Sequence, residues 1–301
     1  MQLICEMVKA NYNVSRTADA MFTSQPGISA MLKSLEDELN VKLFVRHGKR
    51  ITGLSDAGES VFHYAQEVLF NIKAIKEVSQ EFSDKDRGTL DIATTHTQAR
   101  YVLPPVIKKF AKRYPDVQLR IRQGSPTQIS EMVVHGEADF AIATESVAQS
   151  NQLIALPIYQ WNRCVVVPKE HSLARRRKKI TLEDIAEHPI VTYDFAFTGR
   201  SAINHAFNEQ GLKPNIVLTA LDSDIIKTYV ELGLGIGLLA NMAFDPKTDI
   251  NLRKINVGHL FEDSTTYIGF RRDQLIREYI YDFFRWLSPH LSKENIIRAN
   301  S

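Results

Sequence analysis

The 301 residues of the chain are 44% hydrophobic and 24% charged, and the formal net charge is +2. This composition excludes a disordered chain, and the length predicts more than one domain. No apolar run approaches the roughly 20 residues of a membrane helix, and no signal-peptide pattern opens the chain, so we expect a cytoplasmic protein without a membrane partner. Cys5 and Cys164 lack CxxC partners, which argues against a disulfide framework and against a zinc site.

The first 54 residues alternate short helical patterns with tight turns. Apolar spacing predicts helices at residues 3–8 and 15–22, the second capped by Asn13 or Ser15. Pro26 suits the first turn of a third helix that runs to about residue 39. The inward positions expected for this third helix are Ile28, Leu32, Leu35 and Leu39. Its opposite face would carry Gln25, Ser29 and Lys33.

Two short apolar segments flank His47 and Gly48 and predict a small hairpin with basic residues at its tip. Two short helices, a turn, a polar-faced third helix and such a hairpin describe a winged helix-turn-helix. In this unit the third helix enters the major groove of DNA and the wing contacts the backbone. The expected DNA-binding residues are Ser24, Gln25, Pro26, Ser29, Lys33, Arg46, Lys49 and Arg50. The alternative is a small helical subdomain whose basic face is merely solvated.

A long helix is predicted from Ser55 and Asp56, which offer an N-cap, to about residue 83. Its apolar residues follow steps of mostly three and four, and they are Val61, Ala65, Val68, Ile72, Ile75, Val78 and Phe82. One chain does not easily cover such a stripe, so the pattern predicts pairing with a second copy, which would also place two reading heads on a two-fold operator. The alternative is a helix packed on its own domain.

From residue 89 onward, short apolar runs alternate with amphipathic helices, which predicts an α/β domain with a mostly parallel sheet. The predicted strands are 90–93, 117–121, 140–143, 163–167, 191–193, 216–220 and 267–271. The last of these, followed by a helix at 276–287, implies that the chain returns to a first lobe, so that two lobes could close as a hinge. We therefore expect a DNA-binding domain at 1–54, a linker helix at 55–87 and an effector domain at 88–301. Lobe I would take about 88–161 and 264–301, and lobe II about 162–263.

Hydroxyl and amide side chains follow four of the predicted strands, at 94–98, 124–128, 144 and 197–201. Ligands of α/β folds gather at the carboxyl ends of strands, and helix N-termini favour anions. Neutral donors in such places can hold a small oxyanion or carboxylate without a buried counter-charge. For any single threonine, an ordinary helix cap is the alternative.

Other patterns favour structural roles. The glycine-rich segment 233–237 follows a predicted helix at 225–232, which indicates a helix stop and a close-packed turn, not a dinucleotide site. The basic run 175–179 is predicted to be solvated surface. The histidines lack metal-ligand spacing, and we find no nucleophile–base pair or cofactor motif. We therefore expect no metal, no cofactor and no enzymatic activity.

Several motifs carry a resemblance to a known family. Ala18, the segments 24–29 (SQPGIS) and 35–39 (LEDEL), Leu43-Phe44 with Arg46, and Thr52 with Ala57-Gly58 closely resemble the N-terminal domain of LysR-type transcriptional regulators. The segments TTHTQAR, GSPTQI, ADFAIATE, FTGRS and IKTYV resemble the effector domain of the CysB-type members. The resemblance spans nearly the whole chain. It implies an all-α winged helix-turn-helix, a linker helix and a two-lobed α/β effector domain like that of periplasmic binding proteins.

The resemblance also implies the ligand, the partners and the genes controlled. Carried over by match, Thr95, Thr97, Gln98, Thr144 and Thr198 would contact an anion, with Thr127 and Gln128 nearby. The expected inducer is N-acetylserine or a related serine derivative, with sulfate or sulfide as rivals. The expected targets are genes of sulfur assimilation and cysteine biosynthesis. The expected partners are double-stranded promoter DNA, RNA polymerase, and further copies in a homodimer or homotetramer.

The chain departs from the family at two places, and other functions compete with this one. Ala30 and Met31 stand where CysB-type proteins carry polar or basic residues, so base readout is expected to be reduced or shifted. Family members also carry more residues before the first helix, which leaves open whether Met1 is the true start. The rivals are a regulator of sulfonate or other amino-acid-related metabolism, a protein that merely scavenges anions, and an enzyme built on His96 and the threonines.

Overall fold

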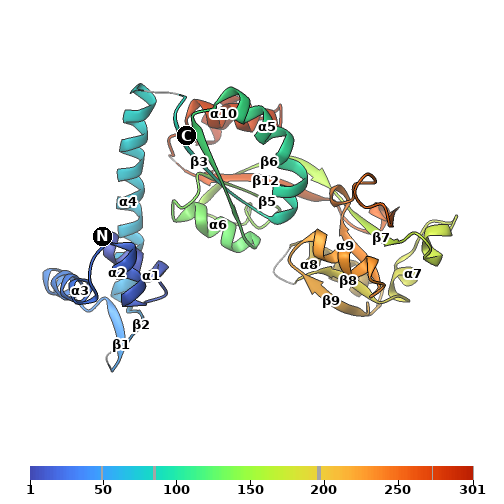
Figure 1. Cartoon of the computed structure of the whole chain (residues 1–301), viewed down its shortest axis with the longest axis horizontal. Coiled ribbons are helices and arrows are strands. Elements are labelled where there is room, and N and C mark those ends of the chain that lie inside the picture. The colour runs from blue at the N-terminus through green and yellow to red at the C-terminus, as the bar shows by residue number, and fades with distance from the viewer. Residues whose placement is uncertain (49, 84–85, 195–197, 273, 301) are drawn as a thin grey trace. The chain divides into compact units, whose positions relative to one another are not determined.

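The computed structural model describes residues 1–301 apart from 49, 84–85, 195–197, 273 and 301, and apart from the side chains of residues 77, 79–83 and 198–201. Two predicted site residues, Lys49 and the side chain of Thr198, therefore lie outside the described part. The chain divides into two compact units, which we call the first unit (Met1–Phe82) and the second unit (Ser83–Ser301). Figure 1 shows both units. The finer division at residues 54 and 87, and the lobe boundaries, stay predictions.

The first unit contains the predicted helices and hairpin. Three helices, α1 (Gln2–Lys9), α2 (Val14–Ala20) and α3 (Gln25–Leu39), precede the strands β1 (Phe44–His47) and β2 (Arg50–Leu54), and α4 (Asp56–Ser83) follows them. The core includes the buried side chains of Ile4, Met7, Ile28, Leu32, Leu43 and Ile51. The inward position predicted for Leu39 is wrong. Leu39 is 39% exposed, because the last turn of α3 extends beyond the residues that pack around Ile28 and Leu32.

Side-chain caps fix where these helices begin. Asn13, not Ser15, caps α2, since its Oδ1 accepts a hydrogen bond from Arg16 N–H at 3.1 Å. The Ser24 side chain accepts from Gly27 N–H at 3.2 Å, and a proline stands in the first turn of α3, as predicted. Ser55 Oγ accepts from Gly58 N–H at 3.0 Å and donates to Lys42 O at 2.6 Å. Ser55 therefore ties the start of α4 to the segment that leads into the wing.

The turn between α2 and α3 contains an unusual backbone conformation. Phe22 has φ 52°, in the left-handed region. Thr23 N–H donates to Ala18 O at 2.9 Å and Phe22 N–H to Asp19 O at 3.2 Å, the pattern of a helix end that normally carries glycine. For a residue with a Cβ this conformation costs about 1–2 kcal/mol. The aromatic side chain is also 98% exposed, so packing in the core does not offset that cost.

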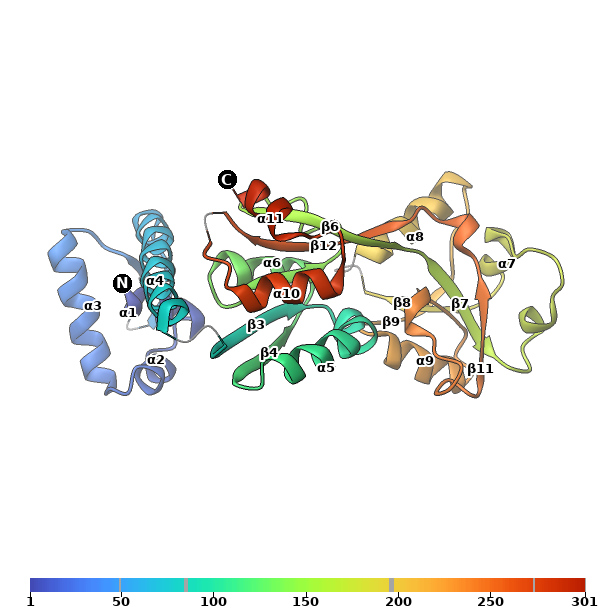
Figure 2. The ribbon, with the colours of Figure 1, turned by 90° about the horizontal axis from the view of Figure 1, so that it is seen from above.

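The second unit contains two five-stranded sheets. The first sheet has the order β4-β3-β5-β12-β6, formed by Val117–Gln123, Gly88–Thr94, Phe140–Ala143, Ser264–Arg271 and Leu153–Trp161. The second sheet has the order β11-β7-β10-β8-β9, formed by Leu252–Asn256, Arg163–Pro168, Ile236–Ala240, Ile190–Tyr193 and Ile216–Ala220. The chain passes from the first sheet to the second between β6 and β7, and it returns to the first sheet between β11 and β12 (Figure 2).

The expectation of a mostly parallel sheet is wrong. In the first sheet β3 pairs in parallel with β4 and β5, but β12 pairs antiparallel with β5 and β6. In the second sheet β8 is parallel to β9 and β10, whereas β7 is antiparallel to β10 and β11. The antiparallel strands are those beside the two crossings between the sheets. The sequence did not predict β6, β10 or β11.

The glycine-rich segment illustrates how β10 escaped prediction. Gly233 has φ 81° and follows the end of α9 (Ser223–Glu231), so the predicted helix stop is confirmed. A Cβ on Gly235 would lie 2.2 Å from Pro189 O, so the close packing is confirmed as well. The wholly buried strand Ile236–Ala240 then begins at once, and it includes part of the segment predicted to be a turn.

Helices cover both faces of each sheet. On the first sheet, α5 (Leu103–Arg113) and α10 (Glu278–Leu287) lie side by side, with the Phe110 and Phe283 rings 5.7 Å apart (Figures 1 and 2). The opposite face packs against α6 (Pro126–Val134). On the second sheet, α8 (Thr198–Glu209) and α9 pack on opposite faces, with α7 (Leu182–Ala186) on the α8 side. The last helix is α11 (Lys293–Asn300).

Among the described residues, no helix is both long enough and apolar enough to cross a membrane.

Candidate DNA interface and effector cleft

The helix α3 and its N-cap expose all of the DNA-binding residues predicted there. These are Ser24, Gln25, Pro26, Ser29 and Lys33, which we call the reading face. Ile28 and Leu32 point to the core from the other side of the same helix. Arg46 and Arg50 are exposed on the two strands of the wing. The structure thus leaves the reading face and the wing cations free to meet a polyanion.

A buried carboxylate connects the wing to α3. Glu36 Oε1 accepts hydrogen bonds from Leu43 N–H at 2.9 Å and Phe44 N–H at 3.3 Å, and Oε2 accepts one from Lys42 Nζ at 3.1 Å. Burial alone would raise the pKa of Glu36, but these hydrogen bonds outweigh it and hold the pKa below its ordinary value. Sequence reasoning missed this role, because an acidic residue in a charged helical segment is usually solvated.

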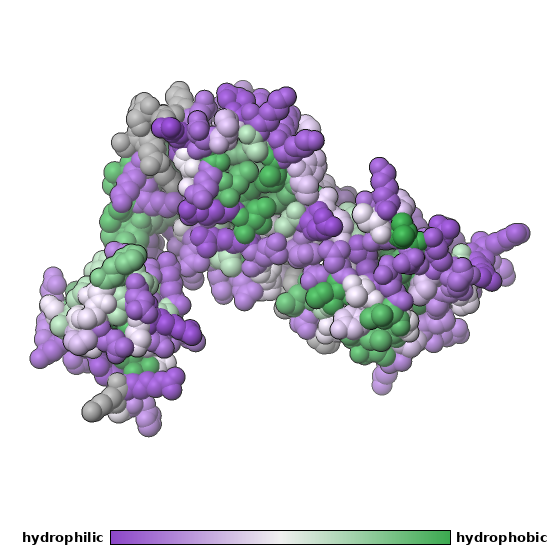
Figure 3. Space-filling view, in the orientation of Figure 1, coloured by the Kyte–Doolittle hydropathy of each residue, from purple (hydrophilic) through white to green (hydrophobic). Residues whose placement is uncertain are grey.

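The apolar stripe of α4 divides into two stretches. Ala65 is buried, and Val61 packs partly on the core of the first unit. Beyond Ala65, the exposed apolar side chains are Val68, Ile72, Ile75 and Val78, with exposed fractions between 42% and 69%. Apolar surface is visible along α4 in Figure 3. The start of the stripe therefore packs on its own domain, while the remainder of the described stripe is uncovered.

Four of the predicted effector residues gather at one edge of the first sheet. Thr95 directly follows β3 and Thr144 directly follows β5, and these strands are parallel neighbours. Both side chains are largely buried. Thr97 and Gln98 follow in the helical segment that leads through a π-helical turn, η1 (Gln98–Val102), into α5. Such turns are often found at functional sites.

Gln98 is held by side chains that the sequence analysis did not select. Its Nε2 donates to Thr266 Oγ1 at 3.4 Å, and its Oε1 accepts a hydrogen bond from the Tyr159 hydroxyl. Thr266 lies on β12 and Tyr159 on β6. The strand predicted at 267–271 began after Thr266, and the strand that contains Tyr159 was not predicted. The sequence therefore gave no signal that would place these two residues beside Gln98.

Thr97 connects the first sheet to the second. Its Oγ1 lies 3.4 Å from the Ser223 hydroxyl at the start of α9. Ser223 in turn lies 2.6 Å from the Tyr193 hydroxyl, which accepts a hydrogen bond from Ala240 N–H at 3.1 Å. Thr97 is thus the predicted residue that meets hydroxyl groups of the opposite lobe.

Thr127 and Gln128 lie apart from this group, on the exposed side of α6. Gln128 has a structural partner, since its Oε1 accepts from Ser125 N–H at 2.9 Å in a capping box. Gln128 also lines a pocket of about 330 Å³, whose wall includes His96, Gln123, Gly124, Ser125, Leu221 and Asp222. The ends of β3, β4 and β9 meet in this pocket, and Gln128 is the predicted site residue that it contains.

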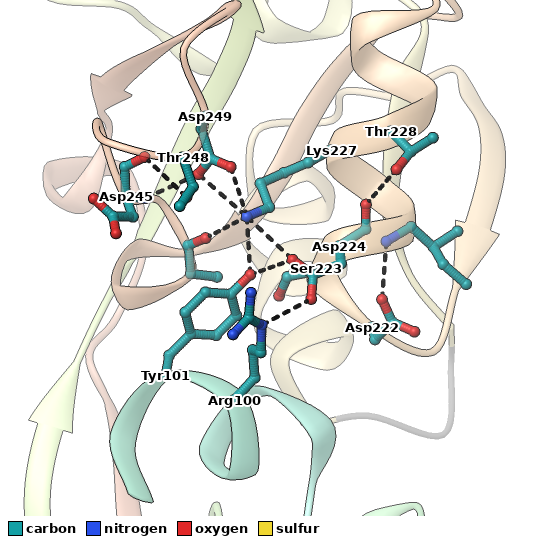
Figure 4. Close-up of polar contacts among 12 residues, drawn as sticks. Arg100, Tyr101, Asp222, Ser223, Asp224, Lys227, Thr228, Asp245, Thr248 and Asp249 are labelled. Carbon is teal, nitrogen blue, oxygen red and sulfur yellow. Dashed lines mark hydrogen bonds and ion pairs between the residues drawn. The ribbon is translucent and has the colours of Figure 1, made fainter. Parts of the chain in front are cut away.

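A network of charged groups joins the two sheets beside this edge (Figure 4). The buried Lys227 ammonium donates to Asp249 at 2.9 Å and 3.1 Å, to Ala243 O at 3.0 Å and to the Tyr101 hydroxyl at 2.8 Å. The Tyr101 hydroxyl donates to Asp224, which also lies 3.2 Å from Lys227. Tyr101 belongs to η1 and the two aspartates and the lysine belong to the second-sheet lobe, so this network fastens the lobes together.

The electrostatics of the network agree with its geometry. Burial alone would lower the pKa of Lys227, but its hydrogen bonds to Tyr101 and Asp249 outweigh burial and raise the pKa above its ordinary value. Burial and the hydrogen bond to Asp224 raise the pKa of Tyr101 to about 12. At neutral pH the lysine is therefore charged and the tyrosine is protonated, which maintains every hydrogen bond in the network.

Arg163, at the start of β7, is a buried cation that sequence reasoning also missed. Its side chain is 1% exposed, and it donates to Glu262 O at 2.9 Å and to Ser264 Oγ at 2.8 Å. Burial lowers its pKa, although the negative charges of Glu145 and Asp263 act in the opposite direction. Arg163 pairs in register with Ala240, whose N–H donates to the Tyr193 hydroxyl, so β7 lies beside the strand that contacts the Thr97 group. The buried Nε of Arg163 and the indole N–H of Trp161 have no hydrogen-bond partner among the described residues.

Three described residues could together hold a metal ion. His96, Asp222 and Asp224 each offer a ligand atom, and these atoms lie within 4.8 Å of one another. However, Asp224 already pairs with Lys227 at 3.2 Å and with Arg100 at 3.6 Å. A metal cation would have to compete with both of these charges, so we assign no metal to this cluster.

Comparisons with known proteins agree with both parts of this description. A family model described as "Bacterial regulatory helix-turn-helix protein, lysR family" matches residues 1–59, and the "LysR substrate binding domain" matches residues 83–292. The HTH-type transcriptional regulators CysB and SsuR of Burkholderia cenocepacia are each 47% identical to the chain. CysB aligns over 99% of this chain and 95% of its own length, and SsuR over 98% and 96%.

A solved structure also resembles the second unit. The cofactor-binding domain of the Cbl transcriptional regulator is 45% identical, with a TM-score of 0.67, over 70% of this chain and 92% of that domain. These relatives are named as transcriptional regulators, not as enzymes. Identity is equal for CysB and SsuR, so it does not favour one over the other. The chain belongs to the LysR family of transcriptional regulators, close to the CysB, SsuR and Cbl proteins.

Proposed function

We propose that the chain regulates genes of sulfur assimilation and cysteine biosynthesis and that a small anion bound between the two sheets of the second unit controls it. The favoured ligand is N-acetylserine or a related serine derivative, and sulfate and sulfide are its rivals. The observation that carries the proposal is the group of Thr95, Thr97, Gln98 and Thr144 at one sheet edge, where Thr97 meets Ser223 of the opposite lobe. Thr198, at the start of α8, would complete the set.

The chemistry of this group suits an anion. Hydroxyl and amide donors at helix N-termini stabilise negative charge, and water is largely excluded where Thr95, Gln98 and Thr144 are buried. The buried Arg163 adds a positive charge on β7, the strand that pairs with β10 at Ala240. A ligand that takes hydrogen bonds from both lobes would favour one separation of the lobes over another, which is how binding could change the DNA-bound form.

On the DNA side, the reading face would enter the major groove, while Arg46, Lys49 and Arg50 would contact the backbone. Acting on promoter DNA implies a cytoplasmic location and a productive contact with RNA polymerase. The alternative targets are genes of sulfonate or other amino-acid-related metabolism. Footprinting on the host genome separates these target sets.

The proposal is tested by binding of the full chain to fragments of its own candidate promoters, at several salt concentrations, with and without N-acetylserine, sulfate or sulfide. We expect affinity to fall steeply with salt, since phosphate contacts release counterions. Thr97→Val removes the hydroxyl and nearly preserves the side-chain volume, and we expect it to weaken the inducer response at least about tenfold while DNA affinity remains. Thr248→Val, at an exposed hydroxyl of the same unit, is the matched control. An absence of salt-sensitive binding to every fragment would leave an anion-scavenging protein as the better account.

We also propose that the exposed stripe of α4 pairs with a second copy, giving a homodimer or homotetramer. Ile75→Glu places a charge on the stripe, and we expect it to lower the oligomeric state measured by sedimentation. Ile250→Glu is the control, because Ile250 is similarly exposed but lies in the second unit. An Ile75→Glu variant with an unchanged sedimentation profile would show that α4 does not form the interface.

A further inference from the structure

Phe22 stands out in the first unit because its aromatic ring is not packed against the described residues. The side chain is 98% exposed, while the backbone holds the left-handed conformation at φ 52°. Glycine or asparagine is the usual residue in this position at a helix end, and a bulky residue there is a genuine outlier. The sequence therefore keeps an aromatic group where folding alone favours its removal. Strained positions of this kind concentrate at functional sites.

The position of Phe22 points to its partner. It lies two residues before Ser24, the N-cap of α3, and three before Gln25, so it adjoins the end of the helix that would enter the groove. Its neighbours Thr23, Ser24 and Gln25 are all exposed. Phe22 therefore lies at the border of the surface that the reading face would present to DNA.

Base-pair chemistry gives an apolar ring at this place one distinctive target. In the major groove, thymine presents a C5-methyl group, and apolar side chains recognise thymine through that methyl group. Burying a methyl group against the ring also removes apolar surface of the ring from water. Resting on the proposed DNA-binding function, we propose that Phe22 is a specificity-determining residue that contacts a thymine methyl group in the operator.

The choice of thymine also fits the composition of α3. Ala30 and Met31 are exposed on this helix, and neither side chain offers a strong hydrogen-bonding group to a base edge. A reading head with fewer polar base contacts depends more on apolar ones. The contact of Phe22 would then carry a larger share of the sequence discrimination.

The test begins with duplexes selected from a randomised pool by the full wild-type chain, which defines an operator. Each thymine of the operator is then replaced by deoxyuridine, which lacks only the methyl group. We expect affinity to fall about fourfold at one position in each half-site and to be unchanged at the others. Replacing cytosine by 5-methylcytosine at that same position, in a duplex carrying a C·G pair there, should recover part of the lost affinity.

The protein variants separate the contact from a structural role. Phe22→Asn suits the left-handed conformation, so we expect its melting temperature to stay level or rise, while affinity for the thymine operator falls about tenfold. Its affinity should no longer depend on the methyl group. Phe22→Tyr keeps the ring and should keep the dependence on the methyl group. Lys33→Ala should weaken binding to the thymine and deoxyuridine duplexes equally.

The outcomes distinguish this inference from the function on which it rests. If the wild-type chain selects no operator and shows no salt-sensitive DNA binding, the proposed function fails. If the wild-type chain binds but deoxyuridine has no effect at any position, or if Phe22→Asn binds as tightly as the wild type, the thymine contact is wrong. Equal loss on thymine and deoxyuridine duplexes would assign Phe22 to the DNA backbone. A lower melting temperature in Phe22→Asn would assign it a structural role.

Discussion

The reading face of α3 and the Thr97 edge of the second unit use polar residues in opposite ways. Ser24, Gln25, Ser29 and Lys33 are exposed at the surface of the first unit. At the Thr97 edge, Thr95, Gln98 and Thr144 are buried, and hydrogen bonds connect the edge to Tyr159, Ser223 and Tyr193. A solvated surface can bind a polyanion such as DNA through its phosphates. A small ligand, in contrast, has to be enclosed by protein groups whose hydrogen bonds replace those that it makes to water. Substitutions on the reading face should therefore change binding alone, and those around the cleft should change stability as well.

The largest effect on stability is expected for Lys227→Met. The substitution leaves Asp249 buried without its partner, and we expect the free energy of unfolding to fall by about 3–5 kcal/mol. The unfolding transition of the second unit in chemical denaturant measures this loss. Lys247→Met, at an exposed lysine two residues before Asp249, is the control and should change stability by less than about 0.5 kcal/mol. Equal stability of the two variants would contradict the role of the network in fastening the lobes.

A smaller loss of stability is expected for Glu36→Gln, which compares a buried polar residue of the first unit with the exposed polar residues of the same unit. Glu36 accepts two backbone hydrogen bonds and one from Lys42, and we expect a loss of roughly 1–3 kcal/mol. Glu38→Gln, exposed on the same helix, should lose almost nothing. Thermal unfolding of the two variants measures the difference. A Glu36→Gln variant as stable as Glu38→Gln would show that the buried carboxylate does not hold the wing.

The same carboxylate predicts a dependence on pH. The pKa of Glu36 is lower in the folded chain than its ordinary value of 4.5, so the folded state binds this proton less readily than the unfolded state. Its stabilising contribution is therefore complete above about pH 4.5 and is lost as the pH falls through the folded pKa. The wild type should lose stability over this acid range more steeply than Glu36→Gln, and parallel curves would contradict the assignment.

Local patterns predicted local structure well in both regions. The strands at 140–143 and 216–220 have the predicted bounds, and α2 is capped by Asn13, one of its two predicted caps. The failures involve contacts between distant segments. Tyr101 and Lys227 are 126 residues apart, and nothing in either neighbourhood indicates that they meet. Glu36 looked like a surface charge, because only the return of the chain at Leu43 buries it.

The most direct test of the account is a footprint of the full chain on a promoter that it binds, recorded with and without inducer for the wild type and for Thr97→Val. For the wild type, we expect N-acetylserine, sulfate or sulfide to change the affinity for DNA or the protected region. Thr97→Val should protect the same DNA but respond to none of them. A wild-type footprint that is identical under all conditions, or a Thr97→Val chain that responds like the wild type, would contradict the coupling of this cleft to DNA binding.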